Sequence, residues 1–357
     1  MGAWSAWRLE GLSRATSRLI LTCPLRWTRS ATLRGFARRA WGPDVCTDDS
    51  EAQPCSPRGG PGQCAGPPVA SQEPAWPTTV TRGELYDHYL TGSEADVTRT
   101  TTGGVLLAGG GTDQPDAFKW LFARAGGGDI VVLRASGADG YHPFAMKIGG
   151  LDSIESFVVK SREASSDAKL LERLGRAEAI FFAGGDQSKY VTFFKDTPVE
   201  ELVNAAAARG VPVGGTSAGL AILGEFSYSA MRASITTAQA LADPLSPDIT
   251  IDKDFLSLKH LDGLITDSHV VERSRLGRTV AFMARLHQDG WLKANGTTPA
   301  RPARALAIDR ETAVLLERDG TATVVGPNTA YFMEAARRHS NIAPAPRSAA
   351  TPFESTK

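Results

Sequence analysis

The chain has 357 residues, of which 42% are hydrophobic, and it carries 39 basic and 39 acidic side chains. This length suits one large domain or two small ones. The balanced charge gives no sign of a nucleic-acid partner or a membrane-surface partner. No stretch approaches the ~18 apolar residues in a row that a membrane-spanning helix needs.

The cysteines exclude two further kinds of structure. Cys23, Cys46, Cys55 and Cys64 all precede Ala75, so the rest of the chain cannot have a disulfide framework. The last three also lack the closely spaced Cys-x-x-Cys pairs that zinc sites use. We therefore expect no metal and no cofactor.

The two ends of the chain differ in composition from its middle. Residues 1–43 contain eight arginines, one acidic residue and no lysine, which is typical of an organellar transit peptide; a disordered leader is the alternative. The compartment stays open: cytoplasmic if the source is bacterial, organellar if it is eukaryotic. Residues 44–75 and 337–357 bury little apolar surface, which predicts a linker and a disordered tail. The folded domain is predicted at 76–336.

Strand and helix patterns alternate through the middle of the chain. Short apolar runs that lead into glycine or polar residues predict strands within 103–111, 129–137, 179–186, 211–215 and 261–269. Helical spacing predicts helices within 115–125, 165–177, 198–210 and 275–290. Buried strands that alternate with helices predict an α/β fold, a doubly wound and mostly parallel sheet. Residues 304–327 have the alternation of a hairpin or meander. Ligands of such folds collect at the carboxyl ends of the strands.

A candidate nucleophile lies where one of these strands becomes a helix. Gly215–Gly219 reads G-T-S-A-G, which fits the G-x-S-x-G pattern with Ser217 at its centre. A sharp strand-to-helix turn exposes the serine, and small neighbours let the backbone fold tightly around it. The N–H of Ala218 could then hold an oxyanion. The alternatives are a phosphate-binding glycine loop and a simple tight turn.

A serine nucleophile needs a base, and His269 is the best placed of the six histidines because it follows a predicted strand. Arg273, Arg275 and Arg278 come next. Such a cluster at a helix start indicates an anionic ligand, although a solvated basic helix start is the alternative. The loop "FFAGGDQSKY" adds Gly185 as a second oxyanion donor and Gln187 as a polar substrate contact.

These motifs resemble the cyanophycinase-like serine exopeptidases of peptidase family S51. The resemblance rests on "AGGDQSKY", "GGTSAGLAILGE" and "ITDSHVVERSRLGR", supported by "GGGTD", "LRASGADGY" and "IDRETAVLL", and runs from about Tyr86 to Met333. It implies a flavodoxin-like sheet, similar to class I glutamine amidotransferases, and cleavage of β-aspartyl-arginine or aspartyl peptides. It also implies a possible homodimer.

The resemblance assigns a role to each candidate residue. Ser217 would be the nucleophile, His269 the base, and Gly185 and Ala218 the oxyanion hole. The substrate pocket would contain Gln187, Asp267, Arg273, Arg275 and Arg278. In it, the arginines suit a carboxylate-bearing substrate, and Asp267 suits a cationic arginyl end.

The sequence departs from the family at the third triad position. Relatives carry a glutamate about thirty residues before the histidine, and here that position holds Gln239. A glutamine can accept a hydrogen bond from the imidazole but cannot neutralise the imidazolium that forms. Asp243 and Asp252 are the nearest substitutes by position, and Glu225 is a weaker one. Relatives also carry an acid where Arg310 stands.

Three functions follow from these observations. The first is an active serine exopeptidase in which Gln239 orients His269. The second is a pseudopeptidase that binds aspartyl or arginyl peptides without turnover. The third is a hydrolase with the α/β-hydrolase fold, in which the histidine normally lies near the C-terminal end after a later acid.

Overall fold

The computed structural model describes residues 22–23, 76–292 and 301–335. The predicted leader, linker and tail lie outside the described residues, apart from the two residues at 22–23, so these predictions stay open. Within the described ranges, no helix is both long enough and apolar enough to cross a membrane.

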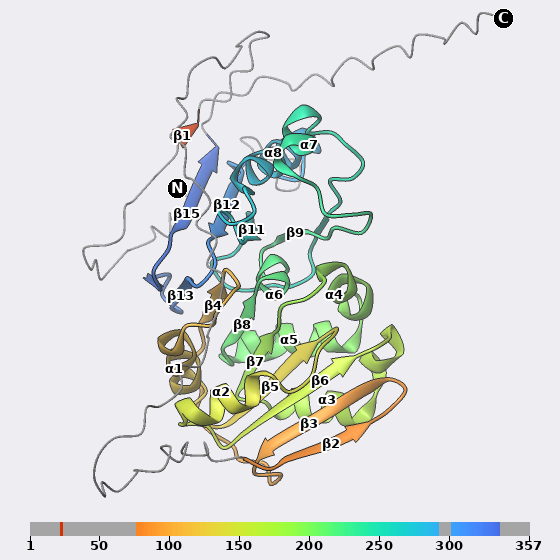
Figure 1. The fold of residues 1–357 in the computed structure, drawn as a ribbon, viewed down its shortest axis with the longest axis vertical. Helices are drawn as coiled ribbons and strands as arrows, with labels where there is room; N and C mark the ends of the chain where they lie inside the picture. Colours follow the sequence, from red (N-terminus) through yellow and green to blue (C-terminus); the bar gives the residue numbers. More distant parts are fainter. Residues whose placement is uncertain (1–21, 24–75, 293–300, 336–357) are drawn as a thin grey trace, which may run out of the picture. The chain divides into compact units, whose positions relative to one another are not determined.

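Nine strands form the main sheet, and its five central strands are parallel (Figure 1). In sheet order, the strands are β14 (Ala322–Val325), β13 (Ala313–Leu316), β4 (Val105–Ala108), β8 (Val213–Thr216), β7 (Ala179–Phe182), β5 (Asp129–Arg134), β6 (Ser153–Val159), β3 (Tyr86–Gly92) and β2 (Thr78–Arg82). The outer strands β14, β13, β3 and β2 pair antiparallel with their neighbours. The carboxyl ends of β4, β8, β7 and β5 therefore meet at one edge.

Helices cover both faces of this sheet. The helices are α1 (Pro115–Arg124), α2 (Tyr141–Ile148), α3 (Ala168–Arg176), α4 (Gln187–Phe194), α5 (Pro198–Arg209) and α6 (Ala218–Ala221), with the short 3₁₀ helix η1 (Arg162–Ser166). Apolar side chains of α1 and α2 pack in one core with alternate residues of the strands, while α3 to α6 share the core on the other face. The central strands are buried on both sides, which explains their continuous apolar sequence.

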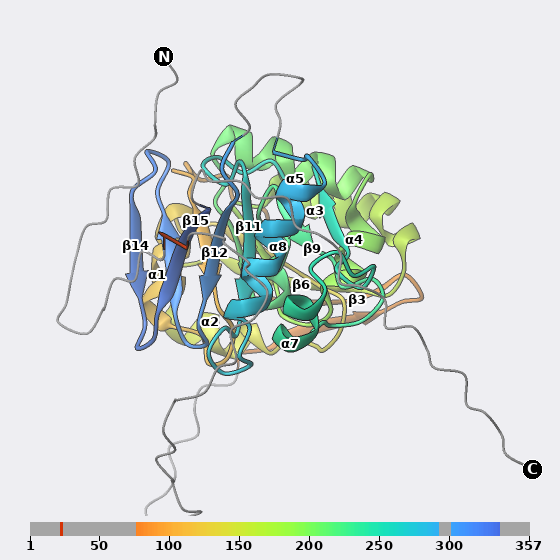
Figure 2. The same ribbon diagram turned by 90° about the horizontal axis from the view of Figure 1, so that it is seen from above.

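Six strands of the described residues form a second sheet, and all of them except β1 come from the part of the chain that follows α6. Its strands are β1 (Thr22–Cys23), β15 (Ala330–Ala335), β12 (Arg304–Ile308), β11 (Leu264–Ser268), β9 (Phe226–Tyr228) and β10 (Ile251–Lys253). Helices α7 (Thr237–Ala242) and α8 (Leu276–Gln288) pack on it through a third apolar cluster, and α8 runs along β11 and β12 (Figure 2). This sheet carries His269, which directly follows β11.

Local sequence explains where several helices begin and end. Pro115 and Pro198 occupy the first turns of α1 and α5, where a missing N–H has no cost. The Asp167 carboxylate caps α3 by accepting from the backbone of Lys169 and Leu170. Gly210 ends α5 in the left-handed conformation, with φ of 100°.

The predicted fold class is confirmed. All five predicted strand regions and all four predicted helix regions overlap the expected element; β8 ends one residue beyond its predicted region, and the other elements are shorter than theirs. The predicted C-terminal hairpin is β13 and β14, which extend the main sheet, whereas β12 belongs to the second sheet. The sequence analysis did not predict a second sheet, and it did not predict strands β2 and β3 of the main sheet.

Candidate active site

Ser217 lies on a sharp turn between β8 and α6. Its φ is 53°, a left-handed value that is uncommon for a residue with a side chain. A Cβ on Gly219 would overlap the carbonyl oxygen of Phe182, and one on Gly215 would lie 2.6 Å from the carbonyl carbon of Gly219. Only glycine therefore fits at both flanking positions. The G-x-S-x-G spacing is a steric requirement of this turn.

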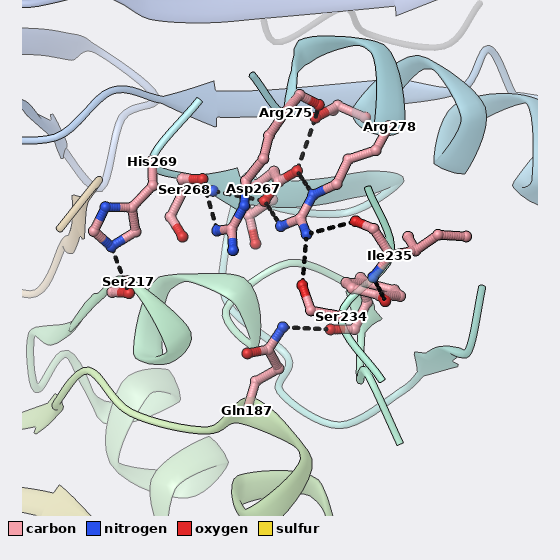
Figure 3. Close-up of polar contacts among 12 residues, drawn as sticks. Gln187, Ser217, Ser234, Ile235, Asp267, Ser268, His269, Arg275 and Arg278 are labelled. Atoms are coloured by element: carbon pink, nitrogen blue, oxygen red, sulfur yellow. Dashed lines mark hydrogen bonds and ion pairs between the residues drawn. The ribbon is translucent and has the colours of Figure 1, made fainter. Parts of the chain in front are cut away.

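His269 reaches the same point from the second sheet. It directly follows β11, its φ is 52°, and its backbone N–H donates to the Gly109 carbonyl at 3.0 Å. The backbone N–H of Ser217 donates to the Ala108 carbonyl, also at 3.0 Å. The segment after β4 thus supports both residues, and Ser217 Oγ lies 2.8 Å from His269 Nε2 (Figure 3).

Gly110 leaves the space that the His269 ring fills. A Cβ at this position would lie 2.6 Å from Cε1 of the ring and closer still to Nε2. We expect Gly110→Ala to displace the imidazole and to lower hydrolytic activity about 100-fold, since small displacements of a catalytic group have effects of this size. The measurement is kcat/KM for peptide hydrolysis, alongside thermal unfolding.

Gly290→Ala is the matched control for this prediction. Gly290 also has a positive φ, of 73°, but a Cβ there would meet nothing within 4 Å. The control therefore imposes similar backbone strain far from the His269 ring. Equal activity losses in the two variants would show that strain, and not displacement of the ring, is responsible.

The other ring nitrogen of His269 has a carboxylate partner. Glu272 Oε2 lies 2.8 Å from Nδ1; the His269 side chain is 8% exposed and that of Glu272 is 37% exposed. Burial lowers the pKa of His269, and the hydrogen bond to Glu272 opposes this shift. The same hydrogen bond lowers the pKa of Glu272. The sequence reading missed Glu272, although its i, i+3 spacing from His269 was visible.

The expectation that Gln239 orients His269 is wrong. Gln239 is the third residue of α7, and its side-chain oxygen accepts from the backbone and the hydroxyl of Thr236 in a capping box. The hydrogen bond at Nδ1 comes from Glu272 instead.

The three substitutes for Gln239 have partners elsewhere. Asp243 accepts from the backbone N–H of Leu245, and Asp252 pairs with Lys195. Glu225 pairs with Arg301 and also accepts from a backbone N–H. None of the three is the carboxylate that contacts His269.

Asp267 and Arg278 form a buried ion pair and are not free to bind substrate, so the expectation for both residues is wrong. Arg278 donates from Nε and Nη2 to the two carboxylate oxygens of Asp267 at 2.8 and 2.6 Å. The Asp267 oxygens also accept from the Thr279 hydroxyl and the Ser268 N–H. Both side chains are at most 3% exposed. The guanidinium lies over the rings of Tyr228 and Phe282, which completes its surroundings.

Arg275, Arg273 and Gln187 remain at the site's rim. Arg275 is half-buried and donates to the Ser268 carbonyl at 3.1 Å, between His269 and the buried pair (Figure 3). Burial and the neighbouring Arg278 lower its pKa to about 10. Arg273 is exposed and precedes α8, which begins only at Leu276. Gln187 opens α4 and donates to the Tyr228 carbonyl at 3.3 Å.

The glycine loop after β7 lies beside Ser217. A Cβ on Gly184 would lie 3.5 Å from the Ser217 Cβ, which places this loop against the serine. Gly185 follows with φ of 145°, and Ala218 is the first residue of α6, where a backbone N–H has no partner inside the helix. Among the residues that the structure describes, no group of three or more His, Cys, Asp or Glu side chains could hold a metal ion.

Comparison with known proteins gives related enzymes. The family model of peptidase family S51 matches residues 151–245. A cyanophycinase from Synechococcus elongatus is 28% identical over 245 residues, which cover 65% of this chain and 68% of that protein. The cyanophycinase of Trichormus variabilis is 24% identical over 248 residues, covering 66% and 75% respectively. A crystal structure of a peptidase from an acI-B1 Actinobacterium aligns with a TM-score of 0.46, at 16% identity, over 67% of this chain and 94% of that one.

Ser217 follows β8 of the main sheet, His269 follows β11 of the second sheet, and their contact is that of a nucleophile and its base in a serine hydrolase. In sequence, the chain is similar to cyanophycinases and, over residues 151–245, to peptidase family S51, which supports a cyanophycinase-like serine peptidase.

Proposed function

We propose that the chain is a serine exopeptidase that hydrolyses β-aspartyl-arginine or related aspartyl peptides. Ser217 Oγ attacks the scissile carbonyl carbon while its proton passes to His269 Nε2. The C–N bond then breaks as His269 returns that proton to the leaving amine. Water hydrolyses the acyl-enzyme by the same route, with His269 taking one of its protons.

The 2.8 Å contact between Ser217 Oγ and His269 Nε2 is the observation that carries this proposal. It joins residues 52 positions apart, on two different sheets, at the edge where such folds bind ligands. The N–H groups of Gly185 and Ala218 are proposed to stabilise the oxyanion, because Ala218 directly follows Ser217 and Gly185 directly follows Gly184, which lies against Ser217. The lowered pKa of His269 favours the neutral imidazole, which is the form that can act as a base.

The surroundings of Arg275 support the proposal that the substrate carries a carboxylate. Among the described residues no carboxylate pairs with it, and its guanidinium is partly removed from water. A substrate carboxylate would provide the missing partner in a charge-assisted bond. Arg273 adds positive charge at the rim. Because Asp267 is neutralised by Arg278, the recognised part of the substrate is its aspartyl carboxylate and not a cationic end.

Arg275→Gln tests the substrate assignment. We expect wild type to hydrolyse β-aspartyl-arginine and aspartyl dipeptides, and the variant to lose about tenfold or more in kcat/KM because a charge-assisted hydrogen bond disappears. The loss should shrink for a substrate in which an amide replaces the free carboxylate. Products are quantified by chromatography and mass spectrometry.

Arg285→Gln is the matched control, since Arg285 lies on α8, the helix that begins directly after Arg275, and pairs with Asp289. Its kcat/KM should stay within twofold of wild type. If wild type cleaves none of these peptides, the proposed substrate class is wrong. If Arg275→Gln reduces the acidic and amidated substrates equally, then Arg275 does not recognise the carboxylate.

A further inference from the structure

We propose that Glu272 is the residue that positions His269 for catalysis, in place of the acid that relatives carry before the histidine. This inference rests on the proposed function of Ser217 and His269. It assigns a Ser217–His269–Glu272 chain in which both hydrogen bonds measure 2.8 Å. The acid comes from the turn directly after the histidine and not from α7, where Gln239 lies.

The backbone of this turn places the Glu272 carboxylate beside Nδ1 of the His269 ring. The N–H of Arg273 donates to the His269 carbonyl at 3.0 Å, and the N–H of Arg275 donates to the Val270 carbonyl at 2.7 Å. The N–H of Val271 donates to Asp309 Oδ1 at 2.8 Å, which attaches the turn to the residue that follows β12. Glu272 therefore projects from a segment that is held at both of its ends and in its middle.

The charges around the turn favour an ionised Glu272. His269 donates to it, and Arg310 and Arg273 lower its pKa further through their positive charges. Arg310 also pairs with Glu311 at 2.6 Å, so it acts on Glu272 from a distance.

An ionised Glu272 would perform two tasks for His269. Its hydrogen bond holds the proton on Nδ1, which leaves the Nε2 lone pair free to accept the proton of Ser217. Its charge stabilises the imidazolium that forms in the reaction. The charged groups facing His269 are Glu272, Arg273 and Arg275, while Gly110 lies on another side of the ring. Glu272 is the one carboxylate among these groups.

The test compares Glu272→Gln with Gln239→Glu. We expect Glu272→Gln to slow labelling of Ser217 by a fluorophosphonate probe ten- to a hundredfold, less than the ~10⁴ known for a fully buried triad acid because Glu272 is partly exposed. Gln239→Glu should change the labelling rate less than twofold, since its side chain contacts Thr236. Glu272→Asp should keep part of the rate.

A pH profile separates positioning from a merely structural role. The Glu272 bond raises the pKa of His269 against the effect of burial. Loss of the charge should therefore move the acid limb of the labelling rate to lower pH while the plateau falls. Thermal unfolding checks that each variant is folded. If Glu272→Gln does not fold, Glu272→Asp provides a second measurement of the same effect.

The outcomes separate this inference from the substrate assignment. Wild-type labelling rate and an unchanged acid limb in Glu272→Gln would overturn the role of Glu272. A large increase in the labelling rate of Gln239→Glu would also overturn the role of Glu272. If labelling depends on Glu272 but no aspartyl peptide is cleaved, the role of Glu272 is supported and the proposed substrate class is wrong. If the probe leaves wild-type Ser217 unlabelled, both are wrong.

Discussion

Replacing Ser217 by alanine should lower kcat/KM for peptide hydrolysis about 10⁴-fold or more. Removal of the nucleophile from a serine hydrolase leaves only binding and oxyanion stabilisation, which account for a small part of the rate. The serine holds a left-handed backbone conformation with His269 Nε2 at 2.8 Å, so the site is organised around this one hydroxyl. Steady-state hydrolysis and mass-spectrometric detection of probe attachment measure the effect.

Ser93→Ala is the control for this variant. The Ser93 hydroxyl is exposed and bonds only to the local backbone at Ala95 among the described residues. It should keep full activity and full labelling at Ser217. Hydrolysis by Ser217→Ala within tenfold of wild type would show that a different group attacks the substrate.

The meeting of Ser217 and His269 could be predicted because it follows from general rules of α/β folds. Each residue comes directly after an apolar strand, and the carboxyl ends of such strands collect functional groups. The glycines around Ser217 gave a second, independent signal, since the turn excludes any Cβ at Gly215 and Gly219. Local sequence therefore carried most of the information needed for this pair.

The partner of His269 could not be predicted, because it depends on one backbone conformation. His269 has a φ of 52° and begins a turn that brings the Glu272 carboxylate to Nδ1 of the histidine ring. Sequence alone does not indicate a left-handed histidine. The family resemblance pointed to Gln239 instead, which serves in the capping box of α7 in this chain.

The charges of the pocket were overestimated for a related reason. Sequence shows three arginines and an aspartate near His269, but not which of them neutralise one another. Packing of α8 against the second sheet buries Arg278 on Asp267, and only Arg275 and Arg273 keep positive charge at the rim. The pocket therefore has fewer free charges than the sequence suggests.

Replacing Arg278 by methionine should destabilise the protein by about 3–5 kcal/mol, the usual cost of removing one partner of a buried ion pair. The Asp267 carboxylate would remain in the core, with hydrogen bonds from Thr279 and Ser268 but without a counter-ion. Arg278 also donates to Ser234 Oγ and the Ile235 carbonyl, so the segment before α7 would lose contacts as well. Urea unfolding followed by circular dichroism measures the free energy.

Arg176→Met is the matched control, because it makes the same chemical change at a surface ion pair. Arg176 pairs with Glu172 on α3, and both side chains are about half exposed, at 52% and 51%. Such pairs contribute about 0–1 kcal/mol, so this variant should unfold nearly as wild type does. The difference between the two variants isolates the effect of burial, since residue type and substitution are the same. If Arg278→Met costs no more than Arg176→Met, Asp267 does not need its arginine, and its negative charge would again be available to a cationic substrate.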